Sequence, residues 1–230
     1  AFPAGMAADA LMLVALPDDA GVAQARKAGA AIGAKLGKLH TLVLAGAHPL
    51  ANEVALGIAL RGYDFSVYQT KPSEDGEAAG ADPIPQGITH GADNAVLADA
   101  QADSAPETPD EPVSEKARVT FMSDDPEALA KSAQDAAAVA EGVFFTRDLV
   151  NEPANVLTTT DFADRLKAME EIGLTVEVLE EDQLADLGMR ALLGVGQGSE
   201  SPSKVVVMRW NGGGDEAPLA LVGKGVVFDT

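Results

Sequence analysis

Short apolar runs alternate with longer amphipathic segments along most of the chain. The apolar runs are typical of strands, and they lie at residues 11–16, 41–46, 63–68, 118–123, 174–179, 204–210 and 219–222. The segments between them show helical spacing and capping residues, which predict helices at 18–38, 52–61, 126–150, 162–172 and 181–188. Strands that alternate with helices indicate an α/β fold.

The pattern breaks between residues 71 and 116, where Pro, Gly, Ala, Asp and Glu dominate and apolar periodicity is weak. Within this stretch, residues 104–115 hold four acids, three prolines and no basic residue. Such a composition is typical of a solvated linker, and a charged recognition segment is the alternative. We therefore expect an N-terminal α/β domain at 1–117, ending in this acidic linker, and a second α/β domain at 118–230.

Charge and composition narrow the possible functions. The 230 residues carry 16 Lys and Arg against 36 Asp and Glu, a formal net charge of −20. Phosphate groups and anionic membranes would be repelled, so we expect neither nucleic acid nor a membrane as a partner. No apolar run reaches the roughly 18 residues needed to cross a bilayer. The chain has no cysteine, which excludes thiolate metal sites and thiol nucleophiles.

Common short motifs do not explain the chain. The glycine-rich segment at 194–198 reads G-x-G-x-G and precedes a predicted strand, so it fails both tests of a dinucleotide-binding loop. We expect instead a backbone crossing that only glycine tolerates. His40, His48 and His90 show no metal-binding spacing, and structural or surface roles are expected for them.

Three longer segments carry a specific resemblance. They are T-R-D-L-V-N-E-P-A-N-V-L-T at 146–158, L-G-M-R-A-L-L-G-V-G-Q-G-S at 187–199 and V-G-K-G-V-V-F-D-T at 222–230. In order and spacing they resemble motifs of the leucyl aminopeptidase family of dinuclear metallopeptidases. The segment at 60–71 resembles, more loosely, the end of that family's N-terminal domain.

The resemblance implies a site, a reaction and a fold. Lys224 and Asp229 match two ligands of a pair of divalent metal ions, zinc or manganese, and the catalytic residues are expected downstream of Thr230. The implied enzyme is a cytoplasmic homo-hexamer that removes N-terminal residues from peptides, with a leucine-like preference, by two-metal hydrolysis. The implied fold is a macro-like α/β domain followed by the first part of a catalytic α/β domain.

Two consequences of this resemblance are expectations about the chain itself. Lys224 must lose its proton before it can bind a metal ion, so metal binding has to offset that cost. A lone Lys and Asp cannot hold two metal ions, so we expect the chain to be inactive without the remaining catalytic-domain polypeptide. The alternative hypothesis is a non-catalytic, macro-like binding or assembly module.

Overall fold

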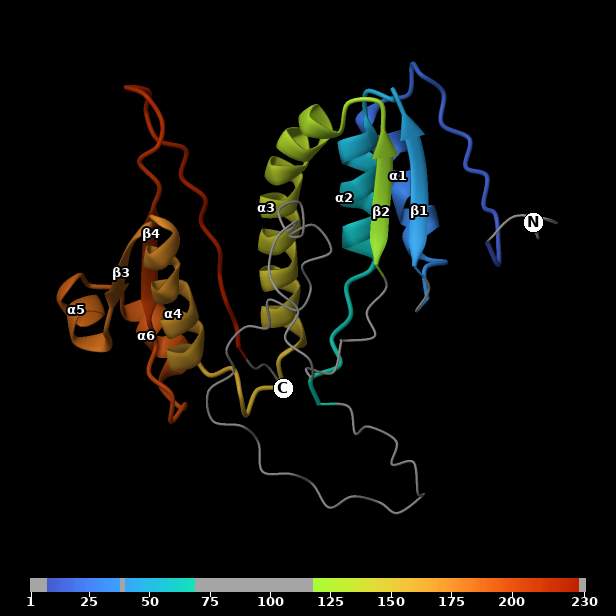
Figure 1. The fold of residues 1–230 in the computed structure, drawn as a ribbon. Helices are drawn as coiled ribbons and strands as arrows, with labels where there is room; N and C mark the ends of the chain where they lie inside the picture. The colour runs from blue at the N-terminus through green and yellow to red at the C-terminus, as the bar shows by residue number, and fades with distance from the viewer. Residues whose placement is uncertain (1–7, 38–39, 69–117, 228–230) are drawn as a thin grey trace, which may run out of the picture. The chain divides into compact units, whose positions relative to one another are not determined.

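The computed structural model describes residues 8–37, 40–68 and 118–227. The chain divides into two compact units between Arg147 and Asp148. Both units contain helices and strands, which confirms the predicted α/β class (Figure 1). The domain boundary predicted between residues 117 and 118 stays a prediction, because the residues before it lie outside the described ranges.

The first unit is built on two parallel strands, β1 (Thr41–Gly46) and β2 (Val119–Ser123). Their register pairs Thr41 with Val119 and shifts by one residue after Leu44. The strands lie far apart in the sequence, with α2 (Ala51–Arg61) between them in the chain, and a parallel pair requires such a long connection. Both strands fall within a residue of their predicted positions.

The two faces of this sheet differ in their surroundings. Val43 of β1 and Phe121 of β2 pack against the buried core. Leu42, Leu44 and Met122 point the other way and are mostly exposed among the described residues. Parallel sheets are usually covered on both faces, so this apolar outer face is unusual.

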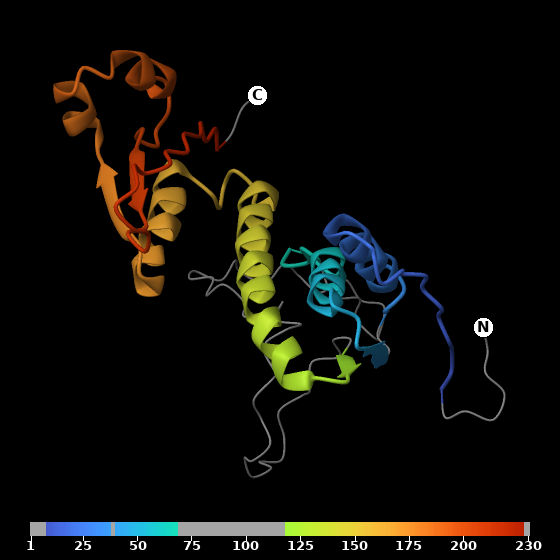
Figure 2. The same ribbon diagram turned by 90° about the horizontal axis from the view of Figure 1, so that it is seen from above.

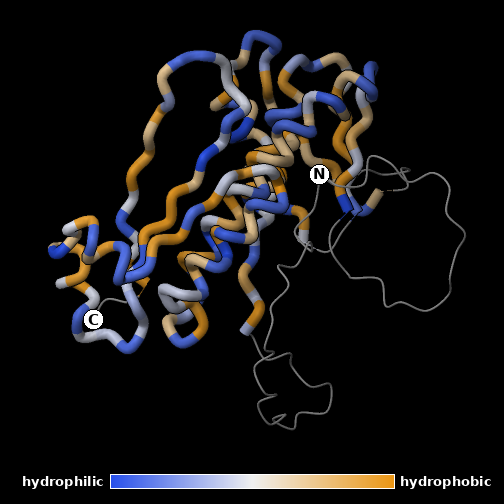
Figure 3. Tube along the Cα trace, turned by 90° about the vertical axis from the view of Figure 1, so that its left-hand side faces the viewer, coloured by the Kyte–Doolittle hydropathy of each residue, from blue (hydrophilic) through white to orange (hydrophobic). Residues whose placement is uncertain are grey.

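Helices α1 (Val22–Gly33) and α2 (Ala51–Arg61) lie side by side behind the strands (Figures 1 and 2). The core between helices and sheet is formed by buried side chains of both helices, namely Ala25, Val54 and Ile58. Apolar and polar residues are interleaved along the trace (Figure 3), because each helix turns only one side to this core.

Helix α3 (Pro126–Asn151) starts where the sequence predicts. The amide of Ala128 donates to Oδ1 of Asp125 at 3.0 Å, which caps the first turn ahead of Pro126. Along α3, Ala140 and Phe144 pack against α2 around Leu56. The helix therefore covers the side of α2 that the first core leaves free.

The second unit pairs β3 (Thr175–Leu179) with β4 (Val205–Arg209) in an antiparallel sheet. Its helical elements are α4 (Thr159–Lys167), a 3₁₀ helix (Ala168–Ile172), α5 (Glu181–Asp186) and α6 (Arg190–Gly196). The fully or nearly fully buried apolar side chains of this unit are Leu157, Ala163, Val176 and Leu184.

Three predicted strands are wrong. Residues 11–16, 63–68 and 219–222 have no strand geometry. A strand must complete its backbone hydrogen bonds with a neighbouring strand, and within the described part of the chain none of the three has such a neighbour. At 63–68 the chain leaves sheet geometry as the Tyr63 ring packs against Phe144, with ring centroids 5.5 Å apart.

Candidate functional site

The segment that resembles the R-D-L-x-N-x-P-x-N motif links α3 to α4. Arg147 stacks over the ring of Tyr63 at 3.9 Å and donates to the carbonyl of Leu60 at 3.0 Å. Beyond the helix, the amides of Val156 and Leu157 both donate to the carbonyl of Pro153. The motif thus forms a helix end followed by a compact turn.

A largely buried ion pair anchors this turn to α4. Nη2 of Arg165 lies 3.1 Å from Oε1 of Glu152, and the two side chains are only 13% and 4% exposed. Sequence reasoning missed this pair, because thirteen residues and a turn separate its members. No periodicity in the sequence would have signalled it.

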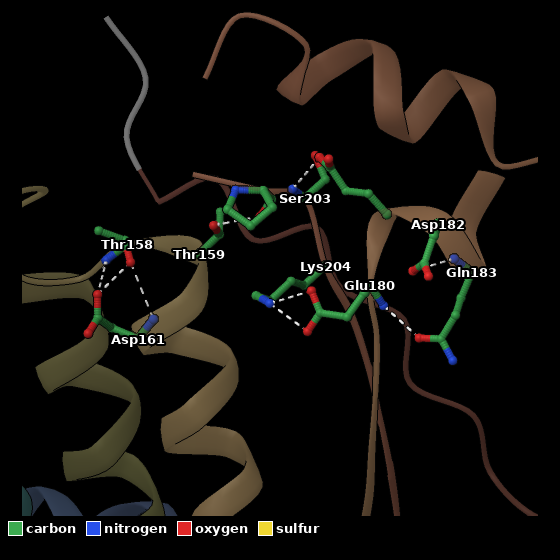
Figure 4. A network of polar contacts seen from close by, with 10 residues as sticks. Thr158, Thr159, Asp161, Glu180, Asp182, Gln183, Ser203 and Lys204 are labelled. Carbon is green, nitrogen blue, oxygen red and sulfur yellow. Dashed lines mark hydrogen bonds and ion pairs between the residues drawn. The ribbon is translucent and has the colours of Figure 1, made fainter. Parts of the chain in front are cut away.

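The start of α4 is fixed by a reciprocal cap, which Figure 4 shows. The amide of Asp161 donates to Oγ1 of Thr158 at 3.3 Å, and the amide of Thr158 donates to Oδ2 of Asp161 at 3.1 Å. The helix begins at Thr159, earlier than predicted. The side-chain hydrogen bond from Thr158 lowers the pKa of Asp161, although slight burial opposes this effect.

The same region is tied to β3 and β4 by further polar contacts. Oγ1 of Thr159 donates to the carbonyl of Pro202 at 2.7 Å. The ammonium of Lys204 lies 2.6 Å from both carboxylate oxygens of Glu180 (Figure 4). These contacts hold the N-terminus of α4 and the start of β4 in one arrangement.

The second motif-like segment covers the turn between α5 and α6 and the end of α6. Gly188 has a φ of 71°, a conformation that favours glycine. A Cβ atom on Gly196 would lie 2.0 Å from the side-chain Oγ of Ser203, whereas one on Gly194 or Gly198 would meet nothing within 4 Å. The expected backbone crossing is therefore not seen at these glycines. An open depression of about 520 Å³ lies beside α6, lined by Glu181, Arg190, Gln197, Ser199 and Glu200 among others.

The third segment carries the predicted metal ligands, and the structure describes only one of them. Lys224 lies in a stretch without regular secondary structure after β4, and its side chain is exposed. Its amine forms no ion pair or hydrogen bond with another described residue. Asp229 lies outside the described residues, so the structure does not test whether the two come together.

The described residues contain no other candidate metal centre. Among residues 8–37, 40–68 and 118–227 there is no group of three or more His, Asp or Glu side chains that could hold a metal ion. The chemistry of the donors fits divalent cations nonetheless, since a neutral amine and a carboxylate both bind zinc and manganese. Lys224 is available for this role because no described acid pairs with it.

The two described histidines, His40 and His48, lie in the first unit. Nδ1 of His48 accepts from the amide of Leu50 at 3.1 Å, and Nε2 lies 3.3 Å from the carbonyl of Pro17. This supports the structural role expected for His48. His40 is exposed, and His90 lies outside the described residues. In the described part of the chain no helix is both long and apolar enough to span a membrane.

Comparisons with known proteins find similarity to peptidases. Residues 144–230 match the model of the "Cytosol aminopeptidase family, catalytic domain". The probable cytosol aminopeptidase of Cereibacter sphaeroides is 54% identical over 230 residues, and that of Dinoroseobacter shibae is 51% identical over 229. Each match covers 100% of this chain and 39% of the relative. The chain therefore spans about two-fifths of the length of these curated relatives.

Solved structures agree with the fold. The bottromycin maturation enzyme BotP matches with a TM-score of 0.53 and 25% identity, covering 82% of this chain and 34% of that chain. The structure of BotP in complex with Mn matches with the same TM-score and 24% identity, covering 83% and 33%.

Proposed function

Because the chain belongs to the cytosol aminopeptidase family, we propose that it is part of an enzyme that removes N-terminal residues from peptides, with a leucine-like preference. The observation that carries this proposal is the match of residues 144–230 to the catalytic domain of the family. Identity above 50% along the whole chain to two probable cytosol aminopeptidases supports it. The proposed location is the cytoplasm, and the proposed assembly is a homo-hexamer.

The proposed reaction is two-metal hydrolysis. Lys224 and Asp229 would hold two divalent cations, zinc or manganese, together with ligands from the remaining catalytic-domain polypeptide. When bound, such a pair supplies Lewis acidity and a water nucleophile for attack on the peptide carbonyl. In this proposal the chain supplies the neutral amine of Lys224 and the carboxylate of Asp229 at fixed positions. By itself the chain is expected to be inactive.

The test uses the full-length polypeptide, meaning this chain joined to the rest of its catalytic domain. We expect Lys224→Ala and Asp229→Ala each to lower both the metal content, measured by mass spectrometry, and the hydrolysis of leucine p-nitroanilide. Lys131→Ala and Asp215→Ala are matched controls, because both residues are exposed and lie outside the proposed site. Full metal content and activity in either ligand variant would exclude this metal assignment.

A further inference from the structure

The stretch that carries Lys224 approaches α4 at Gly225. A Cβ atom on Gly225 would lie 2.8 Å from Cε1 of Phe162, and 3.6 and 3.8 Å from Cδ1 and Cζ of the same ring. At Gly223, on the other side of Lys224, a Cβ atom would meet nothing within 4 Å. Neither glycine has a positive φ, so the restriction at 225 is steric, because a Cβ atom there would require the Phe162 ring to shift.

Phe162 stands on a well-fixed element. Its amide donates to the carbonyl of Thr158 at 2.9 Å, inside the first turn of α4. The cap between Thr158 and Asp161 fixes this turn, and the contact of Thr159 with Pro202 joins it to the segment before β4. The next residue, Ala163, is almost completely buried. The ring therefore projects from backbone that has little freedom to shift.

The stretch around Lys224 has few other restraints. Leu219, Leu221 and Val222 are almost fully exposed. Between residues 217 and 227 no backbone group forms a hydrogen bond with another described residue. This stretch is therefore held by packing alone, and at Gly225 the packing contact is with the Phe162 ring.

We propose that Phe162 is a positioning residue for Lys224. The edge of its ring sets how closely the Gly225 backbone approaches α4, and thereby fixes the backbone that carries the neighbouring amine. This inference rests on the proposed function, because it gives the ring a role only if Lys224 is a metal ligand. Groups that orient metal ligands without touching the metal commonly affect metal affinity by about 10–100-fold.

The experiment is a double-mutant cycle in the full-length polypeptide. The affinity of the apoprotein for Zn²⁺ and for Mn²⁺ is measured by competition with a chelator, and the thermal midpoint of the apoprotein is measured separately. We expect Gly225→Ala to weaken metal binding about tenfold, while Gly223→Ala changes it little. In the Phe162→Ala background, Gly225→Ala should add no further loss, since the ring that it would strike is gone.

Phe162→Leu provides a second measurement that does not depend on the glycine variants. It removes the ring edge but keeps an apolar side chain on α4, so metal affinity should fall while the thermal midpoint of the apoprotein stays unchanged. Equal effects of Gly225→Ala and Gly223→Ala, additive effects in the cycle, or full affinity in Phe162→Leu would each overturn the positioning role. If Lys224→Ala itself retains full metal content, the proposed function fails instead.

Discussion

At the scale of single residues, two ion pairs with the same nitrogen–oxygen distance differ in how deeply they are buried. Arg165 with Glu152, and Arg209 with Glu177, are both Arg–Glu pairs with a nitrogen–oxygen distance of 3.1 Å. The first pair is 13% and 4% exposed and the second 52% and 50%. Water screens the second pair, whereas removal of Arg165 would leave a buried carboxylate without this partner.

Removing each arginine should therefore change the stability of the protein by a different amount. We expect Arg165→Ala to lower the free energy of unfolding by about 3 kcal/mol, and Arg209→Ala to lower it by less than about 1 kcal/mol. Urea denaturation of the two variants measures the difference directly. Equal destabilisation by the two substitutions would show that burial of Glu152 does not matter.

The cap at the start of α4 predicts a dependence on pH. The pKa of Asp161 is lower in the folded protein than its ordinary value of 3.8, so its ionised form stabilises the fold above about pH 4. This contribution is lost as the pH falls through the lowered pKa. The thermal midpoint of Asp161→Asn should therefore lie below that of the unchanged protein at pH 7, and the gap should close towards pH 3. A gap that is constant across this range would contradict the prediction.

At the scale of elements, two glycines set the crossing of α1 and α2. A Cβ atom on Gly29 would lie 2.1 Å from the carbonyl oxygen of Val54, and one on Gly57 would lie 2.1 Å from that of Arg26. Each helix thus presents a glycine to the backbone of the other. Nε of Arg26 also lies 2.6 Å from Oε2 of Glu53, an ion pair across the same crossing.

Methyl groups at this crossing should force the helices apart. We expect Gly29→Ala and Gly57→Ala each to destabilise the first unit by about 2–3 kcal/mol, because backbone cannot yield as a side chain can. Gly142→Ala on α3 is the matched control, since a Cβ atom there meets nothing within 4 Å. Alanine should stabilise α3 by about 0.5–1 kcal/mol. Chemical denaturation followed by circular dichroism gives the sign of each effect.

Several elements and one contact show what the sequence could and could not predict. Apolar patterning located β1, β2 and α3 to within a residue or two, because their periodicity and caps are local. It gave three false strands, because an apolar run does not say whether another strand lies beside it. It placed Lys224 in a motif, but not the Phe162 ring against Gly225, since that contact joins segments more than sixty residues apart.

At the scale of the whole molecule, the chain is one part of a proposed larger enzyme. Its relatives are more than twice its length, and the proposed metal site would need ligands beyond Lys224 and Asp229. Its net charge of −20 is consistent with a substrate other than nucleic acid, but does not identify peptides. The proposal of a peptide substrate comes from the three motifs and from the family match.

The outer face of the first sheet has a further consequence. In β1, Leu42, Val43 and Leu44 are all apolar, so the strand itself does not encode which of its sides belongs inside. The distinction rests on β2, where Thr120 and Phe121 differ in polarity, and on the helices that cover one side only. The neighbours of β1 thus determine which of its faces turns inward. A substitution in β2 or α2 can therefore change the orientation of β1 although the sequence of β1 is unaltered.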